Sequence, residues 1–112
     1  MNKYSLEALK TLVNGDEKFF HEMVSVFVSS THEGFVQMNQ ACETGGWTRV
    51  ADAAHKLISP CIHFEANHLV FLLRQIEHNI RVQNLTEPIP GLLKQAEAEA
   101  NDIIRHIDEN HR

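Results

Sequence analysis

The chain has 112 residues and a formal net charge of −5 at pH 7, with 43% hydrophobic and 22% charged residues. A chain of this size is expected to fold as a single domain, residues 1–112, around one hydrophobic core. No apolar run approaches the ~20 residues of a membrane-spanning helix, and scattered basic residues in an acidic chain argue against nucleic acid as a partner.

The N-terminal segment predicts a short first helix. Ser5 is a suitable N-cap, and the Asn14–Gly15 pair should end the helix. The apolar residues between them recur with helical spacing, at Leu6, Leu9, Leu12 and Val13. The segment lacks the apolar run and cleavage site of a secretory signal, so we expect a cytoplasmic protein.

The longest predicted helix runs from about Asp16 to Glu43. Asn14 and Glu17 have the spacing of a capping box, and Gly45–Gly46 should end the helix. Gly34 weakens it by ~1 kcal/mol relative to alanine without breaking it. The apolar positions that keep a helical period are Phe20, Met23, Phe27, Phe35, Met38 and Cys42, with Val24, Val26, Val28 and Ala41 widening the stripe.

A third helix is predicted from Trp47 to Pro60 or beyond. Pro60 removes one backbone donor and crowds the carbonyl of Lys56, so local rules predict a stop or a kink there. His55 lies about 100° away from the apolar seam of this helix. The seam consists of Trp47, Val50, Ala54, Leu57 and Cys61. Cys42 and Cys61 lack CxxC spacing and are expected to be reduced core thiols.

Two further helices complete the predicted fold. One starts near Ala66 and ends near Gln83, and the other follows the connection Asn84–Gly91 and frays into a polar tail. Their apolar faces carry Leu69, Leu72, Leu73, Ile76 and Ile80, and Leu93, Ala96, Ala100, Ile103 and Ile107. On the first of them, Arg74, Glu77, His78 and Arg81 lie largely opposite the apolar face. We expect an all-α fold, an antiparallel up-down four-helix bundle with a short N-terminal capping helix.

Most familiar chemical motifs are missing from the chain. It contains no nucleophile elbow, no phosphate-binding glycine loop, no HExxH and no paired-cysteine zinc pattern. Asp52-x-x-His55 and Glu65-x-x-His68 have the spacing of di-iron ligands, but the buried glutamates that such sites need on the other helices are lacking. We therefore expect no metal site, and a bundle metalloprotein is the least favoured of the alternatives. Five of the eight histidines are expected on the solvated surface: His21, His32, His78, His106 and His111.

His55 is the leading candidate for chemistry. Ala51 at i−4 and Ser59 at i+4 are small, so the imidazole between them should be uncovered. Asp52 at i−3 is placed to hydrogen-bond and orient it, although solvation alone is the more common fate of such a carboxylate. Ile58 and Ile62 share its flank, and they form either an exposed docking patch or a surface buried by the neighbouring helix.

The surroundings of His55 resemble the histidine-containing phosphotransfer (HPt) domains of two-component phosphorelays. The Ala54–Leu57 run follows the Gly46–Trp47 turn and a long amphipathic helix. The resemblance covers nearly the whole chain and includes Leu6-x-x-Leu9, Gly15–Asp16, Phe27, Glu65-Ala66-x-x-Leu69 and Leu72-Leu73-Arg-Gln-Ile76-Glu77.

The resemblance implies that His55 accepts a phosphoryl group from an aspartyl phosphate on a receiver domain and passes it to another receiver. It implies no kinase activity and no intrinsic cofactor, because the receiver supplies Mg²⁺. The implied partners are response-regulator receivers and a hybrid sensor histidine kinase, and the implied state is a monomer. A neutral imidazole is a competent nucleophile without an activating triad.

Two positions depart from the family pattern. HPt domains commonly carry a lysine and a glycine at the positions of Ile58 and Ser59, and another glycine at that of Glu65. Lys56, or His63 if the chain turns back, could replace the missing positive charge, and a serine leaves room for docking. The departures keep open an adaptor that binds a receiver or kinase without accepting phosphate. In HPt domains the helix continues past the position of Pro60, so the resemblance favours a kink over a stop.

Overall fold

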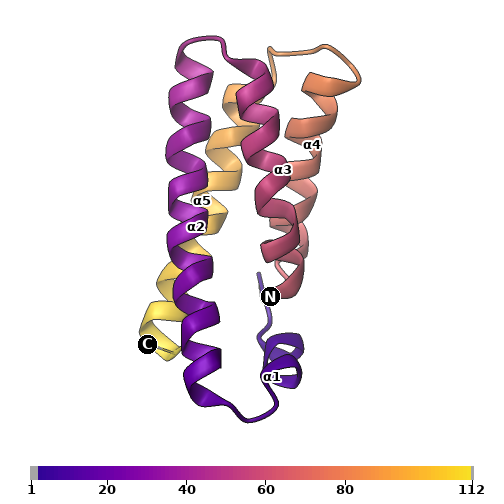
Figure 1. Ribbon diagram of the computed structural model, residues 1–112. Coiled ribbons are helices and arrows are strands. Elements are labelled where there is room, and N and C mark those ends of the chain that lie inside the picture. The colour runs from indigo at the N-terminus through magenta and orange to yellow at the C-terminus, as the bar shows by residue number, and fades with distance from the viewer. Residues whose placement is uncertain (1–2, 112) are drawn as a thin grey trace.

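The computed structural model describes residues 3–111, which form five α-helices and no strand. The helices are α1 (Glu7–Val13), α2 (Glu17–Glu43), α3 (Trp47–His63), α4 (Asn67–Arg81) and α5 (Ile89–His111). The predicted all-α class is confirmed for this part of the chain. Figure 1 shows α2, α3, α4 and α5 side by side along the long axis of the molecule, which measures 44 × 23 × 21 Å.

The four long helices pack so that each one contacts two of the others. α3 packs against both α2 and α4, and α5 packs against both α4 and α2. Short turns join α2 to α3 and α3 to α4, whereas a longer connection leads from α4 to α5 (Figure 1). The backbone N–H of Ser5 donates to the carbonyl of Phe64 (3.0 Å), so the segment before α1 lies against the α3–α4 turn.

The caps at the N-terminal end of the fold differ in part from the predicted ones. Leu6 occupies the N-cap position of α1, and Ser5 instead accepts the N–H of Glu7 (3.2 Å). α1 ends, as predicted, at Asn14, which adopts a left-handed conformation (φ 48°). The cap of α2 is Asp16, whose carboxylate accepts the N–H of Phe19 (3.0 Å), so the predicted capping box is wrong.

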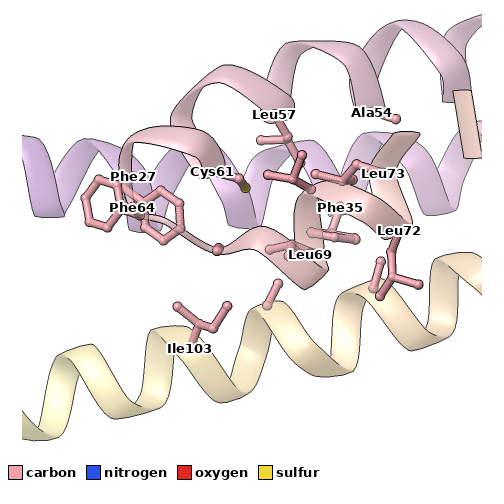
Figure 2. Close-up of a cluster of buried hydrophobic side chains, with 14 of the residues drawn as sticks. Phe27, Phe35, Ala54, Leu57, Cys61, Phe64, Leu69, Leu72, Leu73 and Ile103 are labelled. Carbon is pink, nitrogen blue, oxygen red and sulfur yellow. The ribbon is translucent and has the colours of Figure 1, made fainter. Parts of the chain in front are cut away.

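α3 continues through Pro60 to His63, so the stop that local rules allowed does not occur and the helix runs on past the proline, as the resemblance implied. The residues on either side explain why the helix persists. Cys61 is fully buried, and Phe64 stacks on Phe27 with ring centroids 4.0 Å apart at one end of the core (Figure 2). Their burial outweighs the single hydrogen bond that proline removes. The chain then reverses at Glu65 (φ 52°), where glycine would be unstrained.

α5 begins earlier and runs further than the sequence predicted. Pro90 and Gly91, which were expected in the connection, lie in its first turn, where a missing proline N–H costs no hydrogen bond. Ile89 is fully buried and anchors this early start. At the other end the expected fraying does not occur within the described residues, because α5 remains helical to His111.

The core is one cluster with members from all five helices. The predicted seam of α3 is buried except for Trp47, which is half-buried; Leu12 and Val26, expected inside, are exposed. Both cysteines are free thiols, Cys61 buried and Cys42 half-buried. No helix within residues 3–111 combines the length and apolar character needed to cross a bilayer.

Gly34 allows α2 and α3 to approach each other closely. It is buried in α2, and a Cβ atom added there would lie 2.8 Å from Cδ1 of Leu57 and 3.0 Å from its Cγ. Leu57 follows His55 by two residues, about half a turn, and so lies on the opposite side of the helix. Its contact with Gly34 therefore helps to set the position of the α3 segment that carries the candidate site.

Candidate functional site around His55

The imidazole of His55 is exposed on the outer surface of α3. Its side chain is 69% exposed, whereas Ala54 and Leu57 of the apolar seam are buried. The amphipathic pattern of α3 therefore produces the predicted uncovered histidine: the apolar seam turns toward the bundle, and His55 turns away from it.

One nitrogen of the ring is held by a glutamate from α4. Nδ1 of His55 lies 3.1 Å from Oε1 and 3.0 Å from Oε2 of Glu77, whose side chain is only 20% exposed. An ionised carboxylate can only accept hydrogen bonds, so we assign the imidazole proton to Nδ1. In this tautomer Nε2 carries the unshared electron pair, and it is the nitrogen that the structure leaves without a partner among residues 3–111.

Glu77 is itself held by a cation. Nε of Arg81 donates to Oε2 of Glu77 (2.9 Å), and a terminal guanidinium nitrogen of Arg81 donates to Oδ1 of Asp52 (2.6 Å). Burial alone would raise the pKa of Glu77, but the hydrogen bonds from Arg81 and His55 lower it below its ordinary value. The same bonds with Asp52 and Glu77 raise the pKa of Arg81. Glu77 therefore remains an anion beside His55 at neutral pH.

Two predicted supporting roles are corrected by this geometry. Asp52 does not hydrogen-bond His55, because its carboxylate binds Arg81 on α4 instead. Ala51 was predicted to leave space on the surface beside the imidazole, but it is fully buried. α4 packs along this side of α3, as the Asp52–Arg81 and His55–Glu77 pairs show, so a small side chain next to them is covered.

The other predicted residues lie on the surface or at its edge. Lys56 and Ser59 are exposed, Ile62 is 46% exposed, and Ile58 is half-buried against the core. The predicted apolar patch is thus mainly Ile62. Lys56 lines a cleft between α2 and α3 together with Gln37 and Asp52.

Glu77 and Arg81 were missed as site residues by sequence reasoning. Both were placed on the solvent face of the fourth helix, although each directly follows an apolar position, Ile76 or Ile80. The signals that could have identified them are this position beside the apolar stripe and the i, i+4 spacing of a glutamate and an arginine. Neither signal indicates which residue of the neighbouring helix they meet.

A second histidine–glutamate pair lies between α4 and α5. Nδ1 of His68 is 2.8 Å from Oε1 of Glu99, with side chains 57% and 12% exposed. The ring of Phe71 stacks on that of His68 at a centroid distance of 6.1 Å. Oε2 of Glu99 is buried and has no hydrogen-bond partner within the described part of the chain.

The His55 site offers one accessible nitrogen nucleophile and a fixed anion behind it. Among residues 3–111, no group of three or more histidine, cysteine, aspartate or glutamate side chains is arranged to hold a metal ion. No protein-family model, no curated protein and no solved structure matches the chain. The geometry at His55 therefore carries the functional argument by itself.

Proposed function

We propose that this protein is a phosphorelay intermediate of the HPt kind. In this proposal His55 accepts a phosphoryl group from an aspartyl phosphate on a receiver domain and passes it to a second receiver. The observation that carries the proposal is the exposed imidazole whose Nδ1 contacts Glu77 while Nε2 has no partner within residues 3–111. We further propose that α2–α5 form an antiparallel up-down bundle capped by α1, an arrangement supported by the neighbour order and the short turns.

The proposed reaction is a displacement at phosphorus. The electron pair of Nε2 forms the N–P bond as the bond between phosphorus and the aspartyl oxygen breaks, and the aspartate leaves as a carboxylate. The proton on Nδ1 stays in place, and the positive charge that develops on the ring is stabilised by the Glu77 carboxylate. Transfer to the next receiver reverses these bond changes, so no group on this protein has to act as a general acid or base.

The surroundings of His55 suit a docking partner. Ser59 is small and exposed one turn after His55, and Ile62 adds exposed apolar surface one turn further. In the proposal a receiver packs across this face and brings Mg²⁺ with its acyl phosphate, because phosphoryl transfer depends on positioning and charge stabilisation. The protein then needs no cofactor or kinase activity of its own. It acts as a monomer in the cytoplasm, between a hybrid sensor kinase and a response regulator.

The test is incubation of the purified protein with a phosphorylated receiver. The expected result is an acid-labile, base-stable phosphoryl label on the wild-type protein that is absent from His55→Gln. His68→Gln is the matched control, since it removes the other histidine that is paired with a glutamate, and it should be labelled like the wild type. Full labelling of His55→Gln would contradict the assignment.

The alternative is an adaptor that binds a receiver or a kinase without accepting phosphate. It is favoured by the absence of a lysine at Ile58, which is half-buried against the core. Binding to the receiver that is unchanged by His55→Gln, with no label on the wild-type protein, would select the adaptor.

A further inference from the structure

A phosphoryl group on His55 needs a cation beside it. Such a group carries about −1.5 to −2 charges at neutral pH and offers three acceptor oxygens. The carboxylates of Glu77 and Asp52 are negatively charged and would repel the phosphoryl group. The protein as a whole also has a formal net charge of −5. The positions of the basic residues around His55 therefore indicate which side chain could balance the charge of the phosphoryl group.

Two basic residues near His55 are poorly placed for this role. Arg81 is linked to His55 through Glu77, but its guanidinium already binds the carboxylates of Glu77 and Asp52. Lys56 follows His55 directly, and this turns it about 100° around the helix. There it lines a cleft between α2 and α3, which Gln37 and Asp52 also line.

The register of α3 against α4 places a third basic residue, Arg74, about one turn from His55, near the level of Ser59. The pairs Asp52–Arg81 and His55–Glu77 show that residue numbers rise along α3 as they fall along α4. Arg74 precedes Arg81 by about two helical turns, so the two arginines project from the same side of α4.

The same register of α3 against α4 sets the position of Arg74 along the bundle axis relative to His55. It lies about 4.5 Å along the axis of α4 from Glu77, in the direction that leads along α3 from His55 to Ser59. Arg74 is exposed, and no hydrogen bond or ion pair joins its side chain to any other group within residues 3–111.

We propose that Arg74 is the phosphoryl-binding residue of this site. It would donate guanidinium N–H bonds to the oxygens of the group on Nε2, in the transition state and in phosphohistidine. This inference rests on the proposed phosphoryl acceptance by His55 and names the residue that balances its charge. Arg74 is suited to it because its guanidinium has no competing partner, and a planar fork of donors matches phosphoryl oxygens better than a lysine ammonium does.

Arg81 and Arg74 have different roles in this proposal because they have different contacts. Arg81 holds Glu77, and Glu77 holds Nδ1, so Arg81 is a positioning residue that acts behind the ring. Arg74 acts on the opposite side of the reacting nitrogen, on the group being transferred. A receiver that docks over Ser59 would cover Arg74 and exclude water from its contact with the phosphoryl group, which strengthens that contact.

The test uses phosphoramidate as donor, because this small molecule needs no docking surface. Its P–N bond breaks and ammonia leaves as Nε2 of His55 is phosphorylated. The rate is followed by ³¹P NMR. Arg74→Gln should slow phosphorylation by about tenfold, the effect of losing one charge-assisted hydrogen bond, and Arg74→Lys should recover part of the rate.

The controls separate charge at this position from charge elsewhere. Lys94→Gln makes the same charge change on an exposed side chain, and it should react close to the wild-type rate. Circular dichroism should give the same melting temperature for Arg74→Gln as for the wild type. Phosphorylation of Arg74→Gln at the wild-type rate would overturn the role of Arg74 while leaving His55 as acceptor. Equal phosphorylation of His55→Gln would instead overturn the proposed function.

Discussion

Within residues 3–111, two exposed histidines each contact a largely buried glutamate on the next helix, and only one of these pairs is reinforced by further contacts. Behind His55, Glu77 is held by Arg81, and Arg81 is anchored on Asp52. Behind His68, Glu99 keeps a buried oxygen without a partner in the described chain, and the ring of Phe71 lies nearly parallel to the imidazole at a centroid distance of 6.1 Å.

The difference shows why a histidine–glutamate contact is not enough to define a site. A carboxylate with a cation behind it is fixed in position and remains charged, so it keeps the imidazole in one tautomer. A carboxylate with an unsatisfied buried oxygen is a destabilising feature instead. The proposed acceptor is therefore His55, whose free nitrogen faces solvent and whose other nitrogen is held by a two-helix network.

The largest expected effect comes from moving α3, which forms one side of the His55 pair and no part of the His68 pair. Gly34→Ala places a methyl group against Leu57, so unfolding free energy should fall by about 2 kcal/mol. Gly91→Ala, at a position open to solvent, should instead raise it by up to about 1 kcal/mol. Urea denaturation measures both. Equal effects of the two substitutions would show that the contact of Gly34 with Leu57 does not constrain α3.

The next largest effect is expected from removing the glutamate that fixes the tautomer of His55. Glu77→Ala should slow phosphoryl acceptance by His55 by about tenfold, since one charge-assisted hydrogen bond to Nδ1 is lost. Glu77→Gln should retain more of the rate, because its amide oxygen still accepts the Nδ1–H. Glu99→Ala serves as the control and should have no effect. In ¹⁵N NMR, Glu77→Ala should mix the two tautomers of His55; an unchanged spectrum would contradict the role of Glu77.

Replacing the two glutamates by methionine should change the free energy of unfolding in opposite directions. Glu77→Met removes one of the two anions that hold Arg81 and should lower unfolding free energy by about 1 kcal/mol. Glu99→Met removes a buried oxygen without a partner and should raise it by about 0.5 kcal/mol. Both changes are read from urea denaturation at constant pH. The comparison fails if Glu99→Met is the more destabilising of the two.

The smallest effect is a pH dependence at Glu77. Its pKa in the folded protein is lowered from the ordinary value of 4.5. Its contribution to stability is therefore complete above that value and is lost as the pH falls through the folded-state pKa. The difference in unfolding free energy between wild type and Glu77→Gln should be constant near neutral pH and shrink in acid. A difference that grows on acidification would contradict the lowered pKa.

Periodicity in the sequence located most of the structure because helix faces follow from local spacing. The apolar seam of α3, apart from the half-buried Trp47, is buried as predicted, and so is the repeat in α5 formed by Leu93, Ala96, Ala100, Ile103 and Ile107. Burial of that seam is also what exposes His55. Where local rules failed, at Pro60 and at the start of α5, packing of Cys61, Phe64 and Ile89 outweighed a local preference.

The sequence by itself determined that the chain is helical and that His55 faces outward, since both depend on residues within a turn or two of each other. Only the tertiary structure decided that Glu77 holds Nδ1, that Asp52 binds Arg81 rather than His55, and that Ala51 is covered. These outcomes depend on the register of α4 against α3. That register is set by the packing of whole helix faces and by the turn between them, and no local spacing within either helix encodes it.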